Sequence, residues 1–355
     1  MHQGRRDGVR GPWARDRLRG HGPRSDWHGN GHDGVFAALD LGTNNCRLLV
    51  ARPRDDGFRV IDAFSRIVRL GEGLGLNGAL SEPAMNRTID ALRVCASKIH
   101  KRGVTHARHV ATEACRRASN CGDFVERVRA ETGLVLEIIT SREEAELALA
   151  GCAPLLDPMR GHALVFDIGG GSTELLWLKV GPRERTGRAL ELIDWISLPY
   201  GVVGLAERCD ADAPLGAWYE ETAAEVAALL APFEQRHGIA RLIAEGAVQM
   251  LGSSGTVTTL AGVHLGLPRY DRAFVDGTYL AFDDIDRVSS QLAGMSAEDR
   301  AGLPCIGRDR ADLVVAGCAI LAAICRTWPV GSLRVADRGV REGILMGLMR
   351  PAAVR

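Results

Sequence analysis

Two glycine-rich turns are the segments of this sequence whose residue types best suit chemistry, because each follows an apolar run that ends in aspartate. The first turn begins at Asp40 and the second at Asp167. Glycines let the backbone approach a bulky ligand closely, and successive N–H groups in a turn form an anion-binding nest. We therefore predict that phosphate groups bind to the turn residues Gly42, Thr43, Asn44, Gly169, Gly170, Gly171, Ser172 and Thr173.

The acidic residues beside these turns are predicted metal ligands. A carboxylate would repel a phosphate directly, but it suits a hydrated Mg²⁺ that bridges to the phosphate. Glu174 lies within the strand expected after the second turn, where an unpaired charge is unfavourable, so we expect a metal ion or an arginine beside it. The predicted metal ligands are Asp40, Asp167 and Glu174.

The two turns belong to an internal repeat, in which residues 38–49 align with residues 165–176. The aspartate, the next glycine and two leucines coincide, and each copy has the order strand, aspartate, glycine turn, strand. The repeat predicts two similar domains, each opening with a hairpin whose turn faces a shared cleft. Arg47 in the first copy aligns with Glu174 in the second, which predicts an anion-binding cation across the cleft from a metal-side carboxylate.

A third glycine-rich segment lies between an apolar stretch and a helix expected at 255–265. Because the N-terminus of a helix attracts anions, the small residues of this segment are further candidates for binding phosphate. The alternative is that they only cap the helix. These candidates are Gly252, Ser253, Gly255 and Thr256.

The elements that must hold these turns alternate between strands and helices, which predicts an α/β fold with helices covering a sheet. Ser81 is the predicted N-cap of the first long helix, and Ser141 is the predicted N-cap of a helix at 143–150. The expected strands span 35–40, 46–51, 58–69, 108–111, 134–139, 164–167, 175–180, 190–198 and 333–336. The other expected helices span 81–99, 124–131, 215–236, 255–265, 283–293, 311–328 and 340–350.

The composition indicates two domains and no large basic surface. The 355 residues carry 44 basic and 44 acidic side chains, and this zero net charge argues against sequence-specific nucleic-acid binding. No apolar run reaches the roughly 18 residues of a membrane-spanning helix, and the first 30 residues hold no apolar signal segment. Nine scattered cysteines without a CxxC pair indicate reduced thiols, so we expect a cytoplasmic protein.

The first 33 residues form a separate region that is rich in Arg and Gly, with Val9 and Leu18 as its aliphatic residues. Such a segment cannot bury enough apolar area to offset its ordering entropy, so we expect a disordered tail. The tail is either an arm attracted to a polyanion or an extension without a role.

Seven motifs occur in the order in which the exopolyphosphatase and guanosine pentaphosphate phosphohydrolase family has them, so the chain resembles this family of the actin-like ATPase superfamily. The motifs span 40–44, 69–74, 111–120, 139–145, 167–174, 252–256 and 341–343. The resemblance implies two actin-like, ribonuclease H-like domains at 34–147 and 148–355, each with a mixed sheet flanked by helices. It places an active-site cleft between them and allows the last helix to pack back on the first domain.

The resemblance also implies Mg²⁺-dependent hydrolysis of a terminal phosphoanhydride. The substrate would be inorganic polyphosphate, shortened by one orthophosphate at a time, or a guanosine pentaphosphate trimmed to the tetraphosphate. Glu144 matches the residue that activates water, and Arg116 matches a phosphate contact. Asp167 and Glu174 match the acidic pair near the metal. Arg310 precedes a further similar segment and is expected to reach the substrate. The oligomeric state stays open between a monomer and a homodimer.

The position of Glu144 leaves its role open. It lies in the first turn of the helix expected at 143–150, where the helix dipole should keep the pKa of its carboxyl low. A general base works best with a pKa near the working pH, so Glu144 is expected mainly to orient the water. Two alternatives to a hydrolase remain, namely a kinase of the same superfamily and a protein that binds guanosine tetra- or pentaphosphate without turnover.

Overall fold

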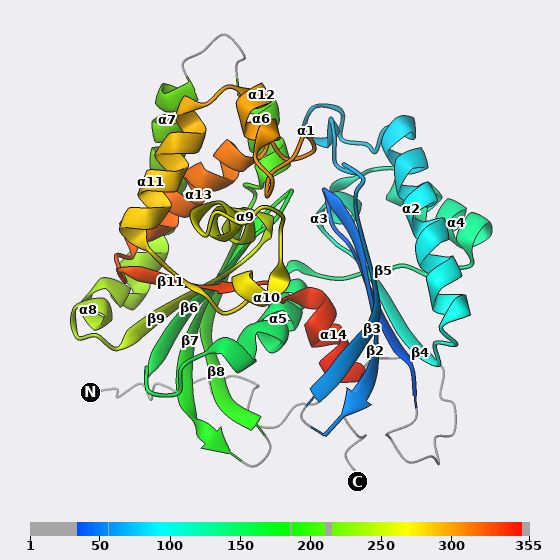
Figure 1. The fold of residues 1–355 in the computed structure, drawn as a ribbon, viewed down its shortest axis with the longest axis horizontal. Coiled ribbons are helices and arrows are strands. Elements are labelled where there is room, and N and C mark those ends of the chain that lie inside the picture. The colour runs from blue at the N-terminus through cyan, green and yellow to red at the C-terminus, as the bar shows by residue number, and fades with distance from the viewer. Residues whose placement is uncertain (1–33, 56, 185–186, 210–214, 350–355) are drawn as a thin grey trace, which may run out of the picture.

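The computed structural model describes residues 34–349, apart from 56, 185–186 and 210–214. The predicted tail at 1–33 lies outside the described residues. Figure 1 shows two lobes, each built on one twisted sheet, with two helices crossing between them. The elements of the first sheet fall between 36 and 138, and those of the second fall between 162 and 336. Both sheets are mixed, so the predicted α/β fold with two actin-like domains is confirmed.

The first sheet has the strand order β3-β2-β1-β4-β5. Its strands β1 to β3 pair antiparallel, whereas β4 and β5 add in parallel beside β1. The strands are β1 (Phe36–Leu41), β2 (Asn45–Arg54), β3 (Gly57–Ile67), β4 (His106–Ala111) and β5 (Glu137–Ile138). The helices of this lobe are α1 (Leu74–Asn77), α2 (Glu82–Lys101), α3 (Glu113–Arg117) and α4 (Cys121–Thr132). Ser81 caps α2 as predicted, because its hydroxyl accepts from the amide of Ala84.

The second sheet has the strand order β10-β11-β9-β6-β7-β8. The strands are β6 (His162–Ile168), β7 (Thr173–Glu184), β8 (Gly187–Leu198), β9 (Val248–Ser253), β10 (Tyr279–Ala281) and β11 (Ser332–Ala336). The helices are α6 (Val202–Arg208), α7 (Leu215–His237), α8 (Ile239–Ala244), α9 (Gly255–His264), α10 (Arg272–Val275), α11 (Phe282–Gly294), α12 (Ala297–Gly302) and α13 (Val314–Thr327).

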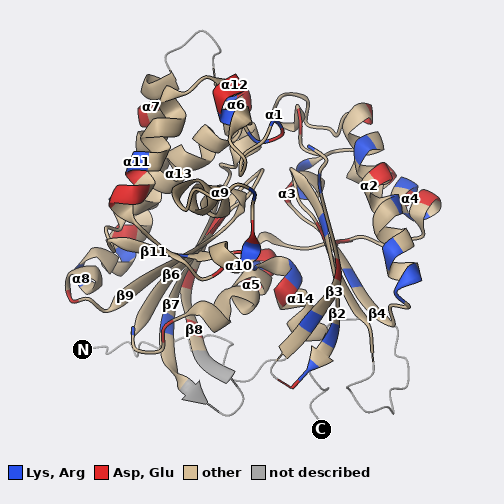
Figure 2. Ribbon diagram, viewed as in Figure 1, with Lys and Arg blue, Asp and Glu red and all other residues tan. Residues whose placement is uncertain are grey.

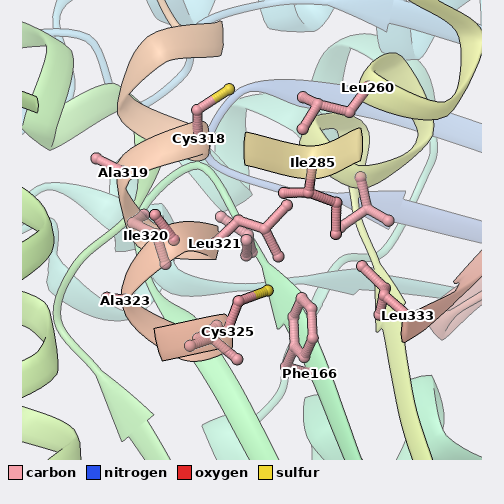
Figure 3. Packing of buried hydrophobic residues seen from close by; sticks show 14 of the residues in the cluster. Phe166, Leu260, Ile285, Cys318, Ala319, Ile320, Leu321, Ala323, Cys325 and Leu333 are labelled. Carbon is pink, nitrogen blue, oxygen red and sulfur yellow. The ribbon is translucent and has the colours of Figure 1, made fainter. Parts of the chain in front are cut away.

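Helix α13 forms the centre of the second core, because every residue from Val314 to Cys325 is buried. Figure 3 shows its apolar side chains packed against Leu260 of α9, Ile285 of α11 and Phe166 of β6. Figure 2 shows the opposite pattern on α2 and α4, where basic and acidic residues lie side by side. Within the described part of the chain, no helix is long and apolar enough to cross a membrane.

The lobes are joined by α5 (Ser141–Cys152), which runs into a short 3₁₀ turn η2 (Ala153–Leu155), and by the last helix α14 (Val340–Met349). Helix α14 packs on β1 and β2 of the first sheet, and α5 packs on β6 and β7 of the second. The two helices touch backbone to backbone. A Cβ added at Gly343 would lie 2.0 Å from the carbonyl oxygen of Leu147, and one at Gly151 would lie 2.2 Å from that of Gly339. Only glycine fits at these two positions.

The opposite rim of the molecule carries a second set of contacts between the lobes. The guanidinium of Arg69 donates to both carboxylate oxygens of Asp312, over 2.9 and 3.0 Å. Nearby, the amide of Gly73 donates to Glu207 over 2.8 Å. These contacts lie where α1 approaches α6 and α12 in Figure 1.

Several local predictions were wrong. Thr140, and not Ser141, caps α5, since its hydroxyl accepts from the amide of Glu143 over 3.2 Å. The strand expected at 134–139 is reduced to Glu137–Ile138, because Leu134 and Leu136 pack into the core before pairing begins. The short helices α1, α3, α6, α8, α10 and α12 were not predicted.

Candidate active site

A cleft between the lobes encloses about 900 Å³ of empty space, counting the part open to solvent. Both predicted turns border it, and the N-terminus of α9 adds a third wall. The predicted site residues that line it are Asp40, Gly42, Thr43, Asn44, Arg47, Glu144, Asp167, Gly169, Gly170, Gly171, Ser172, Gly255, Thr256 and Arg310. Asp40 and Arg310, which are 270 positions apart in the chain, therefore share one cavity, because the two lobes face each other.

Five predicted site residues lie outside the lining of this cleft. Gly252 is packed, since a Cβ there would lie 2.6 Å from the ring of Phe166. The hydroxyl of Thr173 donates to the carbonyl of Tyr200 over 2.7 Å. The others, Ser253, Glu174 and Arg116, lie behind the wall: Ser253 and Glu174 border neighbouring cavities, and Arg116 contacts the carboxylates.

The two hairpins have the same geometry. The pairing of β1 with β2 sets Asp40 across from Arg47, and the pairing of β6 with β7 sets Asp167 across from Glu174. Each turn is closed by an equivalent backbone hydrogen bond of 2.9 Å, from Gly42 to Asn45 and from Gly169 to Ser172. Each aspartate thus lies one residue before the end of its strand, next to a turn that borders the cleft.

The turns also touch one another across the cleft. A Cβ added at Gly170 would lie 3.1 Å from the amide nitrogen of Asn44. One at Gly171 would lie 2.7 Å from the hydroxyl of Thr43 and 2.9 Å from Cγ of Glu113. The glycines therefore allow the two lobes to meet at the two predicted phosphate-binding turns.

Two buried oxygens at the first turn have no partner among the described residues. They are Oδ1 of Asn44 and Oδ1 of Asn45, both from residues that line the cleft. A buried polar atom without a hydrogen bond is unfavourable, so these oxygens favour a ligand that brings a donor or a bound water. Asn45 was not predicted as a site residue, although it follows Asn44 in the same motif.

Arg116 holds Glu144 in place. Its Nη1 donates to Oε2 of Glu144 over 2.8 Å and to the carbonyl of Ile139 over 2.9 Å. Its Nε and Nη2 donate to Oε2 of Glu113, over 3.0 and 2.8 Å. Most of its donors therefore serve protein groups in this state, and contact with phosphate stays a prediction. The sequence signal for Glu113 was its place in the same motif, three residues before Arg116.

Burial dominates the electrostatics of the site. It raises the pKa of Glu144 to about 8, with repulsion from Glu174 adding to the rise and Arg116 opposing it. Burial also raises the pKa of Asp167 to about 7, again with repulsion from Glu174, while Arg47 opposes it. The pKa of Asp40 is raised by burial and held back by Arg47. The expected low pKa of Glu144 is wrong, because burial and a neighbouring acid outweigh the helix dipole.

Glu174 is buried beside two hydroxyl groups. Its Oε1 accepts from Ser172 over 2.6 Å and from Ser197 over 2.9 Å. Burial raises the pKa of this carboxyl, and the two serines partly compensate. From its position in the strand, we expected a metal ion or an arginine beside Glu174. Among the described residues, no arginine makes a hydrogen bond or an ion pair with it.

The acidic groups fit a hydrated Mg²⁺ better than a metal held by protein alone. Among the described residues, no three His, Cys, Asp or Glu side chains gather closely enough to bind an ion together. Mg²⁺ usually takes one or two carboxylates and completes its shell with water and phosphate oxygens. Asp40 and Asp167, which line the cleft, provide such a pair, whereas Glu174 lies behind them. The mutual repulsion of these buried acids favours a cation at this place.

Two arginines give the cleft positive charge. The guanidinium of Arg47 makes no hydrogen bond or ion pair with a described residue, and that of Arg310 makes one hydrogen bond, of 3.3 Å, to the hydroxyl of Thr259. Burial and the charge of Arg47 lower the pKa of the Arg310 guanidinium. Both side chains therefore keep donors for an anionic ligand.

Comparison with known proteins supports the same arrangement. The sequence profile of the Ppx/GppA phosphatase family matches residues 49–351. The PPX-GPPA enzyme of Aquifex aeolicus is 30% identical, with 88% of this chain and 99% of that chain covered and a TM-score of 0.70. An exopolyphosphatase-like protein is 27% identical, with 88% and 97% covered and a TM-score of 0.78. An exopolyphosphatase from Cytophaga hutchinsonii, 24% identical with 89% and 97% covered, shares the fold with a TM-score of 0.78.

Proposed function

Because the chain belongs to the Ppx/GppA phosphatase family, we propose that it removes the terminal orthophosphate of inorganic polyphosphate by hydrolysis. The observation that carries this proposal is Glu144, a carboxyl held by Arg116 at the wall of a cleft bordered by two anion-binding turns. Such a cleft holds a polyanion by its end, and a buried carboxylate beside that end can activate water.

The turns hold the terminal phosphoryl group. Backbone N–H groups of Thr43 and Asn44 in the first turn and of Gly170–Ser172 in the second provide donors from both lobes. The first turn of α9 adds the hydroxyl of Thr256 and the partial positive charge of a helix N-terminus. Arg310 neutralises a further oxygen from the side of α13.

Glu144 accepts a proton from the attacking water. The oxygen of that water forms a bond to the terminal phosphorus, and the bond from this phosphorus to the bridging oxygen breaks. The bridging oxygen leaves with the electron pair on the shortened chain, and the proton goes to the carboxylate of Glu144. A pKa shifted toward neutrality suits this role better than the low value expected from sequence.

Mg²⁺, held through Asp40 and Asp167, would neutralise phosphate oxygens as negative charge moves onto the leaving group. The chain's own contribution is to keep these two carboxylates at the strand ends where the turns begin. Glu174, fixed by two serine hydroxyls, adds negative charge behind them and favours cation binding.

The second candidate substrate is a guanosine pentaphosphate. The observation in its favour is Arg47, whose guanidinium borders the cleft without a partner among the described residues. A nucleotide with phosphates on both sides of its ribose can offer such a cation a second anionic group.

Phosphate release measured with malachite green tests these proposals. We would compare kcat/KM for long polyphosphate, short polyphosphate and guanosine pentaphosphate, using the Glu144→Gln protein purified in parallel as the control for contaminating phosphatases. A preference for polyphosphate supports the first proposal, and a preference for the nucleotide supports the second. Formation of ADP only with a cosubstrate would identify a kinase, and tight nucleotide binding without release would identify a sensor.

A further inference from the structure

A second cavity adjoins the active-site cleft. It encloses about 420 Å³ of empty space, counting the part open to solvent, and we call it the side cavity. Asp40, Arg47 and Asp167 border both spaces, so these residues form a shared wall. The remaining walls include the segment 336–341, which leads from β11 into α14.

The side cavity is bordered by two arginines whose side chains lack a partner among the described residues. The guanidinium groups of Arg47 and Arg341 make no hydrogen bond or ion pair with a described residue, although both residues border the cavity. A third arginine there, Arg338, is neutralised by Asp276 at 2.6 Å. The side chains of Arg47 and Arg341 are both half-buried, and burial together with the charge of Arg47 lowers the pKa of the Arg341 guanidinium. Two neighbouring guanidinium groups of like charge without a carboxylate partner favour an anionic ligand.

The N-terminus of α14 faces the same space. Gly339, Val340 and Arg341 border the side cavity, and α14 continues to Met349. The amide of Gly339 donates to Glu342 over 2.9 Å. The amides of Val340 and Arg341 have no acceptor among the described residues. Free N–H groups at a helix start attract anions, and here they coincide with the unpartnered side chain of Arg341.

The acidic groups of the side cavity are either neutralised or placed to accept a proton. Asp337 accepts a hydrogen bond from Tyr270 over 2.7 Å and lies 3.8 Å from Arg272. The carboxylates of Asp40 and Asp167 would repel an anion, but a protonated oxygen of orthophosphate can donate a hydrogen bond to them. They also line the cleft, where the proposed Mg²⁺ would balance their charge.

We propose that the side cavity is a second phosphate site that binds one free orthophosphate through Arg341, Arg47 and the first amides of α14. A compact tetrahedral oxyanion matches two guanidinium groups and a helix N-terminus. The identification of this ion with the reaction product rests on the proposed function, whereas its binding does not. The site would take the released orthophosphate beside Asp40 and Asp167 while the shortened chain stays in the cleft.

Titration calorimetry with sodium orthophosphate, without substrate, tests the binding directly. Arg341→Gln should weaken orthophosphate binding about tenfold or more, since one charged hydrogen-bonding group is lost. Arg341→Lys keeps the charge and should lie between that variant and the wild type. Arg117→Gln is the matched control, because Arg117 is exposed and borders neither cavity. Wild-type affinity in Arg341→Gln, or no binding to the wild type, would overturn the proposal.

Product inhibition separates the side cavity from the cleft. Orthophosphate in the side cavity should inhibit polyphosphate hydrolysis with a mixed pattern, and Arg341→Gln should raise the inhibition constant about tenfold or more. Purely competitive inhibition that Arg341→Gln leaves unchanged would place orthophosphate in the cleft alone and overturn the proposal.

Two further measurements keep the test decisive. Thermal melting shows whether each variant is folded. If neither Arg341 variant is folded, we would treat the wild-type protein with phenylglyoxal and map the modified arginines by mass spectrometry. Orthophosphate must then protect Arg341 and not Arg117, and equal modification with and without orthophosphate contradicts the proposal. If no hydrolysis is found with any substrate, the calorimetry still decides whether the second site exists.

Discussion

The guanidinium of Arg116 donates to the carboxylate of Glu144 over 2.8 Å, from a helix that precedes α5 by more than twenty residues. This hydrogen bond fixes the orientation of the carboxylate. It also favours the ionised form, against the burial and the repulsion from Glu174 that raise the pKa of Glu144. The same arginine therefore positions the proposed base and lowers its proton affinity.

Glu144→Gln should lower kcat about 10²–10⁴-fold, because a neutral amide cannot accept a proton from water. Substrate binding and the melting temperature should change little, since the amide keeps the shape of the side chain. Glu143→Gln is the matched control, because Glu143 pairs with Arg108 and does not line the cleft. If Glu144→Gln keeps more than about a tenth of the wild-type kcat, another residue is the base, and Glu113 is the next candidate.

Arg116→Gln should move the rising limb of the pH–rate profile to higher pH, by about one unit or more. The sign follows from the charge: Arg116 lowers the pKa of Glu144, so its loss leaves the carboxyl protonated to a higher pH. Arg116→Lys, which keeps the charge, should shift the limb less, and Arg117→Gln should not shift it. A lower kcat without any shift would show that Arg116 serves only as a phosphate or packing contact.

Thermal stability should depend on both pH and Mg²⁺. A carboxyl whose pKa is raised by folding stabilises the fold at low pH, and this contribution is lost as pH rises through the folded-state pKa. For Asp167, this loss of stability takes place over the pH range from the usual pKa of an aspartate up to about 7, the pKa of Asp167 in the folded protein. Without Mg²⁺, the melting temperature of the wild type should therefore fall across this range relative to that of Asp167→Asn.

Mg²⁺ should raise the melting temperature of the wild type more at pH 8 than at pH 5, because protons compete with the cation for the same carboxylates. The increment should be smaller in Asp167→Asn at both pH values. If Mg²⁺ raises the melting temperature of both proteins equally, Asp167 is not a metal ligand. Full activity in excess EDTA would contradict the need for a metal altogether.

Gly343→Ala should destabilise the fold by about 1–3 kcal/mol or more, because the new methyl group would collide with the Leu147 carbonyl at the crossing of α5 and α14. Gly347→Ala is the matched control on the same helix, with open space at its Cβ position. It should be neutral or stabilising by about 0.5–1 kcal/mol, the usual helix preference for alanine. Urea unfolding of the two variants measures both values, and equal stabilities would show that the crossing can relax.

The hairpins and their turns could be predicted from the sequence, because alternating apolar runs and glycines determine the local backbone conformation. The aligned positions of Asp40 and Asp167 became equivalent strand ends, each opening a turn at the cleft. The Thr140 cap of α5 was missed because Thr140 and Ser141 are both good capping residues in adjacent positions. The choice between them depends on how the preceding strand enters the helix.

The electrostatics of the site could not be predicted in this way. The pKa of Glu144 depends on Glu174 from the other lobe and on burial at the interface, and neither is visible in the first turn of a helix. The role of Arg116 toward Glu144 and Glu113 likewise depends on α3, a helix of five residues that carries little periodicity. These properties arise from the packing of distant segments.

The crossing of α5 and α14 constrains how the lobes can move. The chain passes from one lobe to the other twice, after α5 and before α14, and both passages lie at the glycine contacts of this helix pair. Two covalent links so close together leave one axis of rotation. Glu144 on α5 and Arg341 on α14 lie near that axis and would travel little. Arg69 and Asp312, on the opposite rim, would sweep the widest arc, so a small angular displacement at the pivot becomes a large change in the distance between the lobes at that rim.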